Sequence, residues 1–87
     1  MYDSYLLYIK SNCPFCIKAI DRLEKEGHRY KTIMVDDCPK GFICELKDAY
    51  DHKSFPMVLG HNDTYRSYNW IGGHDDLMIH LEHPEKF

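Results

Sequence analysis

Two cysteines separated by two residues are the part of this sequence best suited to chemistry. Cys13 and Cys16 follow an apolar run at residues 5–9 and precede a segment with helical spacing of apolar residues. The unpaired N–H groups and positive dipole end of a helix favour a thiolate on the leading sulfur. Pro14 suits the first helical position, because the N–H that it lacks would have no partner there. The spacing therefore predicts redox chemistry, with Cys13 as nucleophile and Cys16 resolving the mixed disulfide; two buried, inert thiols are the alternative.

The composition limits the classes of protein to consider. The chain has 87 residues, 44% of them hydrophobic, and a formal net charge of −3 at pH 7 with histidine neutral. This length predicts a single domain over residues 1–87. The absence of a Lys and Arg cluster argues against nucleic acid as a partner, and no apolar stretch is long enough for a membrane span. Without a signal-type segment we expect a cytoplasmic protein, in which closely spaced cysteines are more often catalytic or metal-binding than structural.

The elements that position the cysteine pair follow in the order strand, helix, strand, helix, strand, strand, helix. Strands are expected at residues 5–10, 30–35, 57–59 and 65–68, with a hairpin turn at residues 60–63. Helices are expected from the cysteine pair to Gly27, from residue 39 or 40 to about residue 51, and over Leu77, Met78 and Leu81 to a stop at Pro84. The first strand is mostly apolar and should be central. A mixed, four-stranded α/β sheet with helices on its faces is the expected fold.

Two packing assignments follow from the same patterns. Ile17, Ile20 and Leu23 recur at helical spacing, with Ala19 as a further candidate, so we expect this stripe to face the sheet from the first helix. Trp70 is interpreted as a packing residue at the end of a strand.

Three separated motifs resemble those of the glutaredoxin family, a branch of the thioredoxin fold. They are the cysteine loop at residues 10–16, Ser54-Phe55-Pro56, and residues 71–77, which begin with Ile71-Gly72-Gly73. The resemblance covers nearly the whole chain and implies a thioredoxin-like fold. The chain departs from the family pattern at two places: Ser54-Phe55 stands where Thr-Val is usual, and His74 stands where Cys, Ser or Asn often follows the double glycine.

Residues on both sides of the cysteine pair acquire roles through this resemblance. Pro56 would be cis and would turn the backbone of Phe55 toward the sulfurs, where it can pair with an extended substrate. An ordinary trans proline at a strand start is the alternative. Lys10 adds a positive charge near Cys13 and would meet a carboxylate of glutathione, unless it is a solvated lysine. Phe15 is expected to cover the dithiol and offer an apolar contact to substrate.

The resemblance also implies that the start of the last helix holds the γ-glutamyl end of glutathione. Gly73 allows close backbone approach, and the N–H groups after it would bind the carboxylate. His74, Asp75 and Asp76 open this helix, and one aspartate would take the ammonium group; each aspartate is alternatively a helix cap. Lys53 would add a positive charge for the glycine carboxylate.

The predicted function is a dithiol oxidoreductase that reduces protein disulfides and glutathione mixed disulfides with glutathione as electron donor. Glutathione and disulfide-containing proteins are the expected partners, with ribonucleotide reductase a client by family analogy, and we expect a monomer without metal. Two alternatives remain open: a thioredoxin-like electron carrier served by a flavoprotein reductase, and an iron–sulfur carrier using Cys13 and glutathione as cluster ligands across a dimer. Cys38 and Cys44 lack zinc-site spacing and are interpreted as ordinary thiols.

Overall fold

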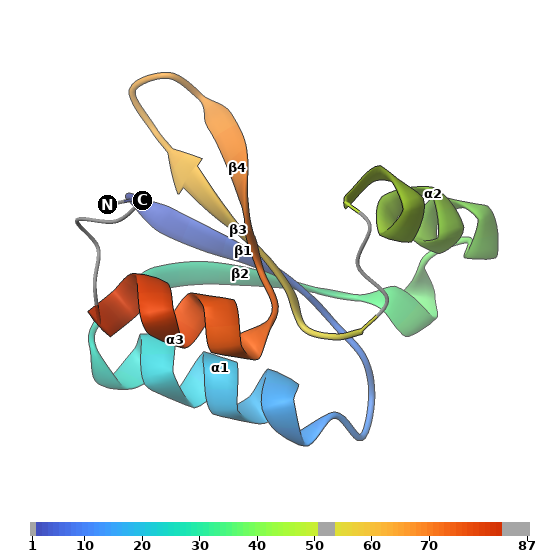
Figure 1. Cartoon of the computed structure of the whole chain (residues 1–87), viewed down its shortest axis with the longest axis horizontal. Coiled ribbons are helices and arrows are strands. Elements are labelled where there is room, and N and C mark those ends of the chain that lie inside the picture. The colour runs from blue at the N-terminus through green and yellow to red at the C-terminus, as the bar shows by residue number, and fades with distance from the viewer. Residues whose placement is uncertain (1, 51–53, 83–87) are drawn as a thin grey trace.

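The computed structural model of the chain describes residues 2–50 and 54–82 (Figure 1). Its elements are β1 (Ser4–Ile9), α1 (Pro14–Lys25), β2 (Arg29–Met34), the 3-10 helix η1 (Val35–Asp37), α2 (Lys40–Tyr50), β3 (Met57–Asn62), β4 (Ser67–Gly72) and α3 (His74–Glu82). The order of strands and helices is the one expected from the sequence, with η1 added. Lys53 and Pro84 lie outside the described residues. None of the helices in the described part of the chain is long and apolar enough to cross a membrane.

The four strands form one sheet in the order β2-β1-β3-β4. β1 pairs in parallel with β2 and antiparallel with β3, and β3 pairs antiparallel with β4. Leu7, for example, lies opposite Thr32 on one side and Val58 on the other. The central position predicted for β1 is therefore confirmed, and the cysteine loop follows directly after its last residue.

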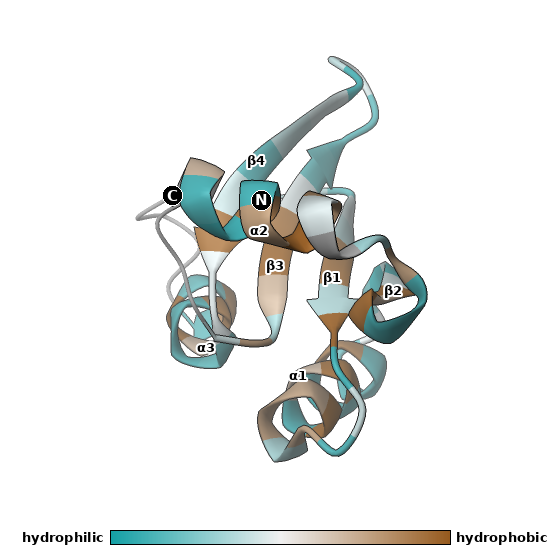
Figure 2. Ribbon diagram, turned by 90° about the vertical axis from the view of Figure 1, so that its right-hand side faces the viewer, coloured by the Kyte–Doolittle hydropathy of each residue, from teal (hydrophilic) through white to brown (hydrophobic). Residues whose placement is uncertain are grey.

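One face of the sheet carries the hydrophobic core. α1 and α3 lie side by side against this face, whereas α2 stands apart at the end of the sheet where β1 leads into the cysteine loop (Figure 1). The alternation of side chains along β1 turns Tyr5 and Leu7 toward α1 and α3. Hydrophobic residues at the start of β3 contrast with the hydrophilic turn of the β3–β4 hairpin (Figure 2). The core cluster consists of Tyr5, Leu7, Ala19, Leu23, Val58, Ile71, Leu77 and Leu81.

α1 faces the sheet with most of the expected stripe, but Ile17 is turned away from it. Its buried residues are Cys16, Ala19 and Leu23, while Ile17 is 61% exposed. Successive residues of a helix are about 100° apart, so the phase that buries Cys16 turns Ile17 to solvent. Ile20 keeps its expected contact with the core. The expectation for Ile17 was therefore wrong, and a cysteine takes the inward position.

The β3–β4 turn lies further along the chain than expected. β3 continues to Asn62, whose side-chain oxygen accepts the N–H groups of Thr64 and Tyr65 at 3.0 and 3.2 Å. This local hydrogen bonding makes residues 63–66 the turn, and β4 consequently extends past Trp70 to Gly72. Trp70 is half-buried within the strand and not at its end.

Gly60 lies inside β3, where an aromatic ring occupies the space that a side chain at this position would need. A Cβ built on Gly60 would overlap the ring of Tyr2. The same ring lies 5.3 Å from the ring of His80 and 6.2 Å from that of Tyr5, measured between centroids. A residue without a side chain in β3 thus allows the N-terminal segment to pack onto the sheet.

Candidate active site

The cysteine pair lies at the start of α1, as its sequence predicted. Cys13 is the N-cap residue, and its Sγ accepts a hydrogen bond from the backbone N–H of Cys16 at 3.3 Å. Pro14 is the first residue of the helix, and Asn12 precedes the pair with a left-handed backbone (φ 57°). The N–H donor and the positive end of the helix dipole stabilise negative charge on the Cys13 sulfur.

The two thiols differ sharply in environment. Cys13 is half-buried at the surface of the protein, whereas Cys16 is 2% exposed. Burial, assisted by the adjacent Cys13, raises the pKa of the Cys16 thiol to about 12. Cys16 therefore stays protonated at neutral pH, which suits a thiol that waits behind the attacking sulfur. This asymmetry supports the order of roles expected for the pair.

The loop before β3 approaches the attacking sulfur through its backbone. The Phe55–Pro56 bond is cis, as the family resemblance implied. The Cys13 thiol donates to the carbonyl oxygen of Phe55, with 3.6 Å between Sγ and oxygen. Pro56 is buried at the entry to β3, and the peptide group of Phe55 before it faces the attacking sulfur.

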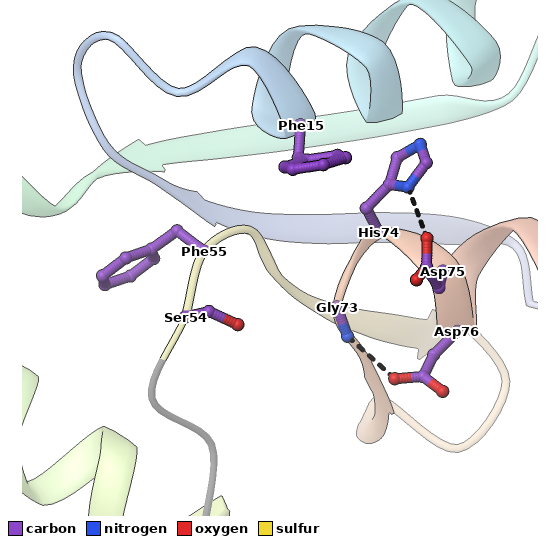
Figure 3. Close-up of a pocket in the computed structure, with 7 residues that line it drawn as sticks. All are labelled: Phe15, Ser54, Phe55, Gly73, His74, Asp75 and Asp76. Atoms are coloured by element: carbon purple, nitrogen blue, oxygen red, sulfur yellow. Dashed lines mark hydrogen bonds and ion pairs between the residues drawn. The ribbon is translucent and has the colours of Figure 1, made fainter.

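Two cavities adjoin at Ser54 and Phe55, and we call them together the dithiol groove. The first, of about 290 Å³, is lined by Phe15, Ser54, Phe55, Gly73, His74, Asp75 and Asp76 (Figure 3). The second, of about 570 Å³, includes Lys10, Cys13, Pro14 and Lys47 and shares Ser54 and Phe55 with the first. All the predicted site residues within the described chain therefore line the groove except Cys16, which lies behind Cys13, and Pro56, which lies under the loop.

Asp76 acts as the cap of α3. Its Oδ2 accepts the N–H of Gly73 at 3.1 Å. Gly72 has a φ of +134°, and a Cβ there would overlap the Asp76 carboxylate. Asp75 does not cap the helix, because its side chain is 93% exposed and its Oδ1 lies 3.0 Å from Nδ1 of His74. The structure thus separates the two aspartates, which the sequence could not.

An aromatic pair spans the first cavity from α1 to α3. The rings of Phe15 and His74 are 5.3 Å apart between centroids, and both point toward the same space (Figure 3). Phe15 is 51% exposed, and Nζ of Lys18 lies 5.3 Å from its ring centroid. Phe15 and His74 therefore form one wall of the first cavity, and the role of Phe15 in covering the dithiol stays a prediction.

Lys47 is the lining residue that sequence reasoning missed. It projects from α2 so that its Nζ lies 5.3 Å from the centroid of the Phe55 ring. Among the described residues neither Lys10 nor Lys47 forms an ion pair. A signal was present, because Lys47 follows Ile43 by four residues and so shares the apolar face of α2. Ser54 was quoted only as part of a motif, yet it lines both cavities.

The described residues contain no group of three or more His, Cys, Asp and Glu side chains able to hold a metal ion. In the dithiol groove, acidic and basic side chains line different cavities. The carboxylates of Asp75 and Asp76 lie in the first cavity, and the ammonium groups of Lys10 and Lys47 line the second.

Comparison with known proteins gives the family. The glutaredoxin family model matches residues 6–62. A solution structure of glutaredoxin from Brucella melitensis superposes with a TM-score of 0.70 at 20% identity, covering 98% of this chain and 85% of that one. A crystal structure of wheat glutaredoxin gives 0.71 at 24% identity, covering 90% and 70%. A third structure, titled for metal binding of glutaredoxins, gives 0.61 at 20% identity, covering 93% and 80%.

No curated protein matches the chain. At these identities the solved structures establish the thioredoxin-like fold, and the family assignment depends on the family model, which spans β1 to the end of β3 and includes both cysteines and Pro56. The chain belongs to the glutaredoxin family of thiol–disulfide oxidoreductases.

Proposed function

We propose that this protein uses glutathione as electron donor to reduce glutathione mixed disulfides and protein disulfides. The observation that carries the proposal is the charge arrangement along the dithiol groove. Asp75 and Asp76 line the first cavity, and Lys10 and Lys47 line the second together with Cys13. Glutathione has a matching order of groups: an ammonium and a carboxylate at one end, a thiol in the middle, and a second carboxylate at the other end.

Each end of glutathione then has a partner of suitable chemistry. Lys10 and Lys47 pair with the glycine carboxylate, because both ammonium groups reach the cavity without an ion pair among the described residues. The first N–H groups of α3 bind the γ-glutamyl carboxylate. Asp75 takes the ammonium group, since Asp76 is committed to capping the helix. Phe15 and His74 form the wall beside the peptide.

The reaction runs through the two sulfurs in turn. The Cys13 thiolate attacks one sulfur of a disulfide and expels the other as a thiolate, which gives a mixed disulfide on Cys13. A substrate peptide pairs with the backbone of Phe55, which lies against the attacking sulfur. A second glutathione then attacks the glutathione sulfur of the mixed disulfide, which forms glutathione disulfide and releases the Cys13 thiolate, or Cys16 attacks the Cys13 sulfur. Attack by Cys16 forms the Cys13–Cys16 disulfide and expels the substrate thiolate, which takes up the proton that the Cys16 thiol loses.

The choice of electron donor tests the proposal. Reduction of a small glutathione mixed disulfide is measured with glutathione and glutathione reductase, and in parallel with a thioredoxin-type flavoprotein reductase and no glutathione. Turnover with glutathione alone as donor is the expected result. Turnover only with the flavoprotein reductase contradicts the proposal and favours the electron-carrier alternative.

A further inference from the structure

A third cavity lies beyond Phe55 and contains the two cysteines outside the family pattern. It has a volume of about 520 Å³, and we call it the side groove. Cys38 and Cys44 both line it, together with Val35 and Ile43. It shares Lys10, Lys47 and Phe55 with the dithiol groove, so the two spaces adjoin at these residues.

One of the two cysteines lies just before α2, and the other lies in its first turns. Cys38 is half-buried two residues before the helix, and its Sγ donates to the carbonyl oxygen of Met34 at 3.7 Å. Cys44 is exposed in the second turn. Helical side chains lean toward the N-terminus, so the side chain of Cys44 leans back toward the segment that holds Cys38. Both thiols are free and face one space.

We propose that Cys38 and Cys44 form a second dithiol, which glutathione disulfide oxidises to an intramolecular disulfide and which regulates the glutathione step at the dithiol groove. The regulatory part rests on the proposed function, whereas the thiol chemistry does not. Glutathione disulfide has carboxylates, and Lys10 and Lys47 supply cations in the same cavity, where the Asp36 carboxylate accepts from the Ser11 hydroxyl.

The exchange has two steps. The Cys44 thiolate, being exposed, attacks one sulfur of glutathione disulfide and releases one glutathione thiolate, leaving a mixed disulfide on Cys44. The Cys38 thiolate then attacks the protein sulfur and releases the second glutathione. The protons of the two protein thiols pass to the two glutathione thiolates, so two protein thiols are oxidised and one glutathione disulfide is reduced.

Formation of this disulfide acts on the dithiol groove through α2. A disulfide holds the Cα atoms of its cysteines about 4.4–6.8 Å apart, so it fixes the first turns of α2 relative to the segment before them. Lys47 is three residues beyond Cys44 and lies on the same side of the helix. α2 also meets β1 through the rings of Phe42 and Tyr8, whose centroids are 5.9 Å apart. A constraint at the start of α2 is therefore transmitted to Lys47.

The thiol chemistry is tested without the catalytic pair, in a Cys13→Ser, Cys16→Ser variant treated with glutathione disulfide. We expect loss of both remaining titratable thiols and a peptide that joins Cys38 to Cys44, with no glutathione retained. Adding Cys38→Ser should trap glutathione on Cys44, and adding Cys44→Ser instead should leave Cys38 largely reduced. Peptide mapping of the wild-type protein should find the same Cys38–Cys44 link, which guards against a folding defect of the variants.

Three results would overturn the second dithiol: both thiols remaining free, separate glutathione adducts that persist on Cys38 and Cys44, or a disulfide that joins two copies of the chain. The regulatory part has its own measurement. The KM for glutathione of the wild-type protein should change at least about twofold when the Cys38–Cys44 bond is present, and a Cys38→Ser, Cys44→Ser variant treated identically should not change. An unchanged KM of the wild-type protein would reject the regulatory part. Whether Cys38 and Cys44 form a disulfide is decided by the peptide mapping alone.

Discussion

Cys16 contributes to the attacking sulfur in two ways: its backbone N–H donates to Sγ of Cys13 at 3.3 Å, while its own thiol lies buried behind that sulfur. The residue that stabilises the thiolate is therefore also the residue that later attacks the same sulfur in a mixed disulfide and expels the substrate thiolate. A serine at position 16 would keep the N–H and remove only the second contribution.

This separation predicts different results for the two cysteine variants. Cys13→Ser should reduce turnover of every substrate to the background rate of glutathione alone, because no attacking thiolate remains. Cys16→Ser should keep activity on a glutathionylated peptide and lose it on protein disulfides that need two thiols. Steady-state assays with both substrate types provide the measurement. Equal losses in both variants on both substrates would contradict the assigned roles.

Substitution of Lys47 should weaken glutathione binding. An ion pair near the surface contributes up to about 1 kcal/mol, so Lys47→Gln should raise the KM for glutathione by up to about fivefold with little change in kcat. The effect should shrink at high salt, because screening weakens such pairs. Lys31→Gln is the matched control, since Lys31 is exposed on β2 outside the dithiol groove. A KM that responds equally to both substitutions would show that only net charge matters.

Gly72 and Gly27 should respond differently to alanine. Both have positive φ, but a Cβ at Gly72 would overlap the Asp76 carboxylate, whereas a Cβ at Gly27 would meet nothing within 4 Å. Gly27→Ala should therefore cost about 1–2 kcal/mol of unfolding free energy from backbone conformation alone. Gly72→Ala should cost more and should also weaken glutathione binding, because it displaces the cap of α3. Urea unfolding of the two variants gives the comparison, and equal destabilisation would refute the contact with Asp76.

His80 should make the protein less stable below neutral pH. Its side chain is fully buried, with Nε2 at 3.1 Å from the Tyr5 hydroxyl, and burial lowers its pKa below the ordinary 6.5. Above that value the histidine is neutral in both the folded and unfolded states, so its packing contributes fully. As the pH falls through 6.5 the unfolded chain binds a proton that the folded protein does not, and the free energy of unfolding decreases.

Urea unfolding between pH 7.5 and 5.5 measures this dependence. His80→Phe should flatten the part of the curve below pH 6.5, whatever its effect on stability at pH 7.5. His61→Gln serves as the control, because His61 is partly exposed beside Asp63, and it should leave the decrease caused by His80 in place. A His80→Phe curve as steep as that of the wild-type protein would assign the pH dependence to other groups.

The sequence predicted the parts of the site that lie close together along the chain. The cysteine pair, Pro14 and the helix that follows form one local unit, and the apolar composition of β1 indicated its central place. Ile17 was misplaced because hydrophobic spacing gives the width of a helical stripe but not its phase against the sheet. Lys47 was missed because its four-residue spacing from Ile43 marks only a shared face of α2, whereas its place beside Phe55 results from the packing of α2 against the loop before β3.

Because Gly60 has no side chain, the first residues of the chain depend on a position in the middle of β3. The ring of Tyr2 fills that position and screens the buried Tyr5–His80 contact from one side. An alanine at position 60 would expel this ring from its slot without breaking the ladder of β3. A substitution at Gly60, in the middle of the sheet, would thus release Tyr2 near the start of the chain and expose His80 to water.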